Sequence, residues 1–101
     1  MTVARIWRGW TRRDDAAAYT EYVRAAGFGS YFATPGNRGA FVLRRDEDDR
    51  TEFLSLSLWD SLEALRRFAG EPVARRDLCP EDGRNLVERE PTVTHFDVVV
   101  P

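Results

Sequence analysis

A strict alternation of side chains along residues 51–59 (TEFLSLSLW) predicts a β-strand. Successive side chains of a strand point to opposite faces of its sheet. One face of this strand therefore carries three leucines, whereas the other carries aromatic and serine side chains. The first face has Leu54, Leu56 and Leu58, and the second has Phe53, Ser55, Ser57 and Trp59. Both faces of the predicted strand thus offer large apolar groups.

Three further segments are rich in β-branched and aromatic residues, which favour strands. They are residues 2–10, 39–45 and 92–100. The charged run DEDDR at residues 46–50 is expected to connect the second and third strands as a hairpin. Residues 28–38 contain glycine, proline and asparagine, and we expect them to form a loop that ends in a turn.

Two helices are expected between these strands, because apolar residues recur there at helical spacing. The first covers residues 12–26, with Thr11 as its N-cap. The second begins after Asp60 as its N-cap and ends at Gly70. Residues 72–87 are expected to hold a short helical turn or two, interrupted by Pro80 and Gly83.

The predicted order of elements is β-α-β-β-α-β, which is typical of a ferredoxin-like α+β fold with a four-stranded antiparallel sheet. Two helices cover one face of such a sheet and leave the other face open. Since the strand at residues 51–59 is apolar on both faces, a monomer would expose a large apolar surface. We therefore expect a homodimer in which the two open sheet faces pack together.

Length and composition narrow the class of protein. The length of 101 residues indicates one domain over residues 1–101, and 43% hydrophobic residues are enough for a core. The net charge of -2 gives no reason to expect a nucleic-acid partner. No apolar run is long enough for a membrane span, and no signal-peptide stretch is present. A single cysteine, Cys79, fits a reducing compartment, so we expect a cytoplasmic protein.

Three segments of the chain resemble the antibiotic biosynthesis monooxygenase family. The run LSLWDSLEALRRFAG at residues 56–70 is similar to the third strand and second helix of that family. The turn ATPGNRG at residues 33–39 and the run THFDV at residues 94–98 also fit the family. The resemblance implies the dimeric α+β barrel fold that these proteins adopt.

The same resemblance implies a cofactor-independent monooxygenase that acts on a small aromatic or polyketide-like substrate and O₂. In that chemistry the substrate is deprotonated, and its anion reacts with O₂ without a bound cofactor. The protein contributes a dry pocket, positioning and stabilisation of the anion. A metal site is not expected, because one histidine and one cysteine do not make a standard zinc ligand set.

The family also contains haem-degrading monooxygenases, and this sequence departs from their pattern. Those proteins use an asparagine on strand 1, a tryptophan within helix 2 and a haem-ligating histidine shortly after it. Here strand 1 has no asparagine, and Phe68 stands at the place of the tryptophan. Residues 71–87 contain no histidine. The resemblance therefore favours chemistry without haem.

His95, the only histidine, is the candidate catalytic base, because its ordinary pKa suits proton transfer near neutral pH. The alternative for a histidine without a partner motif is a half-exposed strand position or a hydrogen bond at the dimer interface. Trp59 ends the third strand, where the corresponding tryptophan of the family often borders the pocket. Its indole N–H is suited to orient a substrate oxygen, and the alternative is a plain core tryptophan.

Aromatic residues gather around the first helix and the loop after it, which would suit a flat polycyclic substrate. The expected wall residues are Tyr22, Phe28, Tyr31 and Phe32. Packing of the first helix on the sheet is the alternative role for Tyr22. Arg44 is a candidate for binding a phenolate or carboxylate, unless it is a surface charge. Asn37 is a further substrate-binding candidate, and a role confined to the turn is its alternative.

Two other functions fit the same fold. One is a polyketide cyclase or isomerase that uses His95 for enolisation without O₂. The other is a non-catalytic dimeric protein that binds a ligand or assists another enzyme. A fold alone does not choose among these functions, so the choice depends on the chemistry of the site.

Overall fold

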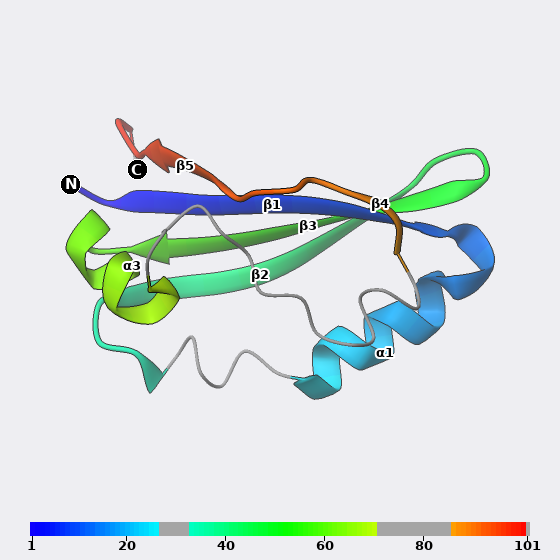
Figure 1. Ribbon diagram of the computed structural model, residues 1–101, viewed down its shortest axis with the longest axis horizontal. Helices are drawn as coiled ribbons and strands as arrows, with labels where there is room; N and C mark the ends of the chain where they lie inside the picture. The colour runs from blue at the N-terminus through cyan, green and yellow to red at the C-terminus, as the bar shows by residue number, and fades with distance from the viewer. Residues whose placement is uncertain (27–32, 71–85, 101) are drawn as a thin grey trace.

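The chain folds as an antiparallel sheet with a helix towards each end of its strands in this computed structural model (Figure 1). The structure describes residues 1–26, 33–70 and 86–100. The strands are β1 (Val3–Arg12), β2 (Asn37–Asp46), β3 (Arg50–Trp59), β4 (Leu86–Arg89) and β5 (Thr94–Asp97). The helices are α1 (Ala16–Ala26), which follows the 3-10 turn η1 (Arg13–Asp15), and α3 (Leu62–Ala69). This arrangement confirms the ferredoxin-like α+β fold.

The centre of the sheet is formed by β3 and β1, in the strand order β2-β3-β1-β4, and β5 also pairs with β1. All four pairings are antiparallel. β4 pairs with the later part of β1, whereas β5 pairs with its beginning. Two short strands therefore occupy the edge position that we expected a single last strand to fill.

Our prediction of one strand over residues 92–100 was wrong in its bounds, because the edge is divided between β4 and β5. Pro91 lies between these two strands, and proline lacks the N–H group that a strand ladder requires. The segment 72–87, where we expected a short helical turn or two, ends in a strand, because Leu86 and Val87 belong to β4. The rest of that segment, residues 72–85, lies outside the described residues.

The first helix begins later than predicted, because Thr11 belongs to β1 and does not cap a helix. Thr11 pairs with Thr51 on β3 and with Leu86 on β4, and its side chain is fully buried. Arg12 precedes η1 without a side-chain capping bond. Pairing on both sides of β1 supplies Thr11 with backbone partners, and this outweighs its local preference for a helix start.

The second helix is capped by Ser61. Our prediction that Asp60 would be the N-cap was wrong. The hydroxyl oxygen of Ser61 accepts a hydrogen bond from the backbone N–H of Ala64 at 3.1 Å. The Asp60 carboxylate instead lies 3.6 Å from the Arg38 guanidinium. The backbone N–H of Asp60 donates to the carbonyl oxygen of Gly36 at 2.8 Å. Asp60 therefore joins α3 to the turn before β2, and the next residue takes the capping role.

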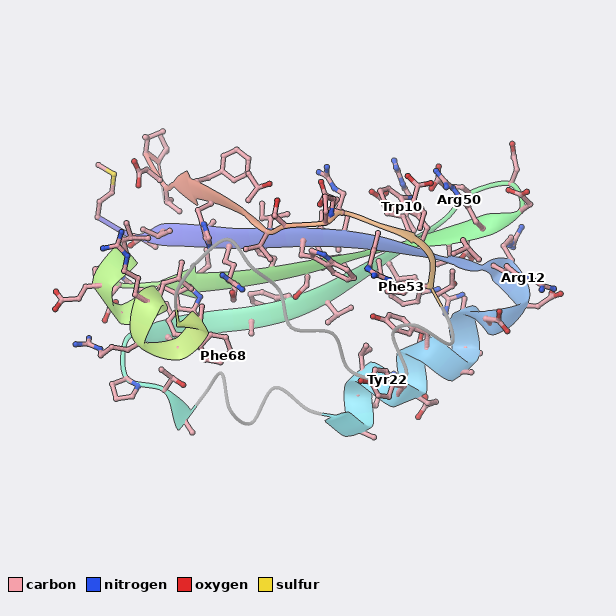
Figure 2. All side chains as sticks on the ribbon, viewed as in Figure 1. Trp10, Arg12, Tyr22, Arg50, Phe53 and Phe68 are labelled. Carbon is pink, nitrogen blue, oxygen red and sulfur yellow. The ribbon has the colours of Figure 1, made fainter. Side chains whose placement is uncertain are left out.

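Two apolar clusters lie on the helix-covered face of the sheet, one beneath each helix. Under α3, Trp59 packs against Leu65 and Phe68. Under α1, the Tyr19 ring packs edge-on against Phe53, with ring centroids 4.9 Å apart. Figure 2 shows Phe68 at the α3 end of the sheet and Phe53 at the α1 end. Each such buried side chain contributes roughly 1.5–3 kcal/mol to stability by its removal from water.

The opposite face of the sheet is apolar along the half nearer the start of β1, as the alternation in residues 51–59 predicts. Phe41 on β2 is 51% exposed, and Phe96 on β5 is 53% exposed. The strand register places a continuous set of apolar side chains on this face. They are Ala4, Ile6, Phe41, Leu43, Leu54, Leu56, Leu58 and Phe96. We call this set the open apolar face.

The other half of that sheet face is charged. The Arg50 guanidinium stacks over the Trp10 ring, 5.0 Å from its centroid, and lies 2.7 Å from the Glu88 carboxylate (Figure 2). The Trp10 indole N–H donates to Glu47 at 3.1 Å. Exposed ion pairs contribute little stability individually, but they keep this end of the sheet hydrated. The open apolar face is therefore bounded by a charged cluster.

Candidate active site

A row of polar side chains crosses the helix-covered face of the sheet from β5 through β1 to β3. Arg5 on β1 is the register partner of both His95 on β5 and Ser57 on β3. Directly opposite residues of antiparallel strands project from the same face of a sheet. The three side chains are therefore neighbours, although the sequence places them far apart. We call His95, Arg5 and Ser57 the polar row.

The polar row lies between the two apolar clusters. On its α3 side, the next pair in register consists of Val3 and Trp59, which are 5% and 0% exposed. On its α1 side stands Trp7, which is 3% exposed and donates its indole N–H to the Glu90 carbonyl at 2.8 Å. Hydrogen bonds and charges act more strongly in such apolar surroundings than in water.

Arg5 and His95 are joined by a hydrogen bond of 3.1 Å between Nη1 and Nε2. A guanidinium group has donors and no acceptor. The Nε2 atom of His95 must therefore be the acceptor, which leaves the single ring proton on Nδ1. The bond thus requires a neutral histidine whose lone pair points at Arg5.

The pKa of His95 lies below its usual value, chiefly because partial burial disfavours the charged ring. The positive charge of Arg5 lowers the pKa further. His95 is consequently neutral near neutral pH, and a neutral imidazole is the form that acts as a general base. The structure therefore shows His95 as a neutral imidazole whose Nε2 lone pair accepts from Arg5.

Arg5 did not stand out in the sequence, yet it is 9% exposed and is the one arginine among the buried residues that the structure describes. The available signal was its position between Val3 and Trp7, on the inward side of the alternation in β1. Burying a guanidinium is costly unless its donors are used. An inward arginine on a strand is therefore a candidate for binding a ligand.

Trp59 is engaged with the polar row through Ser57. The Trp59 indole N–H donates to the Ser57 hydroxyl oxygen at 2.9 Å, and the Trp59 ring lies 5.0 Å from that of Phe68. The N–H group that we expected to meet a substrate oxygen is therefore used inside the protein. Because the Ser57 oxygen accepts from Trp59, its O–H group points elsewhere as a donor. Trp59 thus acts on the row by orienting Ser57.

Arg44 and Asn37, both expected to bind substrate, make contacts that hold β2 in place. Arg44 donates to the Thr20 hydroxyl on α1 at 3.2 Å. The Asn37 amide donates to the carbonyl oxygens of Gly39 and Leu58, and its oxygen accepts from the Gly39 N–H. Arg44 therefore connects β2 to α1, and Asn37 organises the irregular start of β2, where the register shifts. Neither residue belongs to the polar row.

The expected aromatic wall is only partly described by the structure. Tyr22 packs against Tyr19 with ring centroids 5.8 Å apart, in the cluster beneath α1 (Figure 2). This contact is the helix-packing role that was the alternative for Tyr22. The other three expected wall residues, Phe28, Tyr31 and Phe32, lie outside the described residues, and so does Cys79.

The donors and acceptors of the polar row are a guanidinium, a hydroxyl group and a neutral imidazole. Such a set suits an oxygen atom that carries or develops negative charge. Within residues 1–26, 33–70 and 86–100, no group of three or more His, Cys, Asp or Glu side chains is placed to hold a metal ion. No helix in the same part of the chain has the length and apolar character needed to cross a membrane.

A family model described as antibiotic biosynthesis monooxygenase matches residues 3–76. The chain belongs to the antibiotic biosynthesis monooxygenase family. Arg5, Ser57 and Trp59 lie within the matched residues, whereas His95 lies beyond them. Membership of the antibiotic biosynthesis monooxygenase family therefore does not by itself account for the Arg5–His95 pair. No curated protein matches the chain.

Several solved structures share this fold over nearly the whole chain. A Bacillus cereus protein described as an antibiotic biosynthesis monooxygenase has a TM-score of 0.72 at 13% identity, covering 99% of this chain and 95% of the other. SnoaB, a cofactor-independent oxygenase from Streptomyces nogalater, has a TM-score of 0.65 at 22% identity, with 99% and 95% covered. A haem-degrading protein from Mycobacterium tuberculosis has a TM-score of 0.65 at 20% identity, with 100% and 98% covered. At these identities the likeness shows the shared fold.

Proposed function

We propose that this protein is a cofactor-independent monooxygenase of a small aromatic or polyketide-like compound, with His95 as its general base. The 3.1 Å bond between Arg5 and His95 carries this proposal, because it requires a neutral imidazole on the helix-covered face. Membership of the antibiotic biosynthesis monooxygenase family supports it. The fold shared with SnoaB, a cofactor-independent oxygenase, gives further support.

In the proposed reaction the substrate supplies the electrons that reduce O₂. His95 takes a proton from the substrate, and the resulting electron-rich anion reacts with O₂. With an anthrone-type substrate, the methylene carbon loses both hydrogens and gains one oxygen atom as a carbonyl group. The other oxygen atom leaves as water, so no external reductant is needed. The protein takes the proton, holds the anion and keeps it away from water.

The chemistry of His95 argues against a role as a haem ligand. Iron at Nε2 would displace Arg5 from the acceptor to which it now donates. Iron at Nδ1 would move the ring proton to Nε2, where it would face a guanidinium donor. Both arrangements break the one hydrogen bond between the two residues. We therefore propose an activity that does not use haem.

Oxygen uptake by the purified protein with an anthrone tests the proposed activity. We expect uptake by the wild type and a loss of about 10²–10⁴-fold in His95→Gln, which is the usual range for removal of a general base. Thr94→Ala is the matched control, because Thr94 adjoins His95 in β5 and belongs to the opposite sheet face. Absence of uptake by the wild type across a series of anthrones would count against the oxygenase.

Enolisation without O₂ is the second candidate function, since a neutral His95 on this face suits that reaction equally well. A cyclase or isomerase would turn over at the same rate with and without O₂, whereas the oxygenase would stop without it. A non-catalytic ligand-binding or accessory protein would keep its biological effect in a folded His95→Gln variant. Turnover with and without O₂, together with the biological effect of His95→Gln, therefore distinguishes the three functions.

We also propose that two copies of the chain form a homodimer through the open apolar face. Phe41, Leu43 and Phe96 on this face are each about half exposed, at 51%, 49% and 53%. A contiguous apolar patch of this kind usually marks an interface. A two-fold axis through the patch would bring identical apolar halves together and leave the charged cluster around Trp10 and Arg50 at the margin.

A further inference from the structure

His95 is in the protonation state of a base, but its lone pair is already in use. Arg5 donates to Nε2, and the ring proton occupies Nδ1. Neither ring nitrogen accepts a further proton while this hydrogen bond lasts. Arg5 must therefore turn to another acceptor before His95 acts as a base.

We propose that Arg5 is the anion-binding side chain of this site and that it exchanges His95 for the hydroxyl oxygen of a planar phenol or enol. The exchange releases Nε2 to accept the proton of that same hydroxyl group. The catalytic meaning of this exchange rests on the proposed function, whereas the binding of the anion does not. The role of Arg5 thus links ligand binding to the activation of the base.

The proton transfer balances without an oxidant or a reductant. The O–H bond of the ligand breaks, and an N–H bond forms at Nε2 of His95. The electron pair of the broken bond stays on the oxygen, and the resulting oxyanion accepts a hydrogen bond from the Arg5 guanidinium. His95 becomes an imidazolium with a proton on each nitrogen. Ser57 stands opposite Arg5 on β3, and its hydroxyl oxygen accepts a hydrogen bond from the Trp59 indole.

The distance between the two side chains limits the class of ligand. Nη1 of Arg5 and Nε2 of His95 are 3.1 Å apart. The ligand oxygen that Arg5 binds and the ligand proton that His95 accepts must therefore belong to one hydroxyl group or to adjoining atoms. A carboxylic acid is already ionised near neutral pH and has no proton to give. Apolar side chains (Val3, Trp7 and Trp59) flank the polar row on the same sheet face, and such surroundings suit an apolar ring better than a strongly hydrated ligand. A planar phenol or enol meets all three conditions.

Binding of 4-nitrophenol without O₂ tests the inference, because its phenolate absorbs visible light and its neutral form does not. The methyl ether 4-nitroanisole has a similar ring and no acidic proton. In slightly acidic buffer we expect the wild type to bind the phenol about tenfold more tightly than the ether, since hydrogen bonds to charged groups are the stronger kind. The bound ligand is expected to show the phenolate spectrum.

Two arginine variants show whether this preference depends on Arg5. Arg5→Gln is expected to lose the preference for the phenol and the phenolate spectrum. Arg8→Gln is the matched control, because Arg8 belongs to the same strand but to the opposite sheet face, and it should retain both. Equal binding of phenol and ether by the wild type, or an unchanged preference in folded Arg5→Gln, would overturn the inference.

Nitrogen NMR of His95 provides a readout that does not depend on a variant. Binding of 4-nitrophenol to the wild type should convert Nε2 from a lone-pair acceptor into an N–H group, and 4-nitroanisole should not. No change at Nε2 on saturation with the phenol would overturn the inference even if Arg5→Gln does not fold. Bound phenolate without oxygen uptake from any anthrone would contradict the oxygenase alone. Oxygen uptake together with equal binding of phenol and ether would contradict the role of Arg5 alone.

Discussion

Arg5 and His95 are 90 residues apart in the chain, yet the guanidinium of the first donates to Nε2 of the second at 3.1 Å. The contact exists because β5 returns to pair antiparallel with the beginning of β1. The backbone N–H of Val98 donates to the carbonyl oxygen of Thr2 at 2.8 Å and closes the same edge of the sheet. In acid both side chains would be cations. In this contact Arg5 is the cation and His95 is a neutral imidazole.

The pKa of His95 should rise when the charge of Arg5 is removed. In the wild type we expect the pKa to lie below 6.5, because burial and the Arg5 charge both disfavour the imidazolium. Arg5→Gln relieves the repulsion and should raise the pKa, whereas Arg8→Gln on the opposite face should leave it unchanged. His95 is the only histidine, so an NMR titration reports on it directly. An equal pKa in all three proteins would show that the Arg5 charge does not reach the ring.

The free energy of unfolding should decrease as the pH falls through about 6.5, in part because of His95. Folding lowers the pKa of His95, so the unfolded chain binds this proton more readily and acid favours unfolding. This loss of free energy of unfolding is absent above pH 6.5, and it grows as the pH approaches the lower pKa of His95 in the folded state. Along the strand, Asp97 shares this face with His95, and Arg5 faces it from β1.

Urea denaturation of the wild type and of His95→Gln at a series of pH values measures this contribution. The carboxylates titrate in both proteins, so the difference between the two pH profiles isolates the histidine. We expect the wild type to lose more stability than His95→Gln between neutral pH and the lower pKa. Parallel profiles across this interval would show that folding does not change the pKa of His95.

Ser61→Ala should destabilise the protein by about 1 kcal/mol, because it removes the hydroxyl oxygen that accepts from the Ala64 N–H. Asp60→Ala is the matched variant at the preceding position. It should cost less, since the Asp60 carboxylate makes an exposed pair with Arg38 and does not cap the helix. Thermal or urea unfolding of both variants distinguishes the two positions. A larger loss of stability in Asp60→Ala than in Ser61→Ala would show that Asp60 is the N-cap, as the sequence indicated.

Phe41→Glu should weaken the proposed homodimer at least about tenfold, because it replaces a large, half-exposed apolar side chain of the open apolar face with a charge. Leu62→Glu is the matched control, since Leu62 is also exposed, at 39%, but starts α3 on the helix-covered side. Sedimentation equilibrium of the two variants and the wild type gives the dissociation constants. A monomeric wild type, or a dimer that survives Phe41→Glu unchanged, would show that this face is not the interface.

The sequence was sufficient for the fold class and for the two-sided character of the sheet. Alternation along residues 51–59 determines which β3 side chains face the helices, because neighbouring side chains of a strand diverge by covalent geometry alone. The same local rule, applied to β1, places Arg5 on the inward side. The family resemblance also came from contiguous residues, which a sequence displays directly.

Local preferences were insufficient where two elements compete for one residue. Thr11 has the side chain of a helix cap, but pairing with β3 and β4 keeps it in a strand. Asp60 has an equally good capping side chain, but its backbone belongs to the turn that reaches Gly36. In both cases the decisive partner comes from another segment of the chain. The starts of both helices therefore shifted by a few residues, while the order of elements was preserved up to the last strand, which is divided into β4 and β5.

Only the tertiary structure decided that His95 has Arg5 as a partner and that the Trp59 indole donates to Ser57. Strand register sets which residues stand opposite each other, and a shift of one residue would turn Arg5 away from His95. That register results from pairing and packing between segments up to 90 residues apart, which no local pattern encodes. The sequence by itself determined that His95 is the only imidazole in the chain, and the fold determined which of its nitrogens is an acceptor and what donates to it.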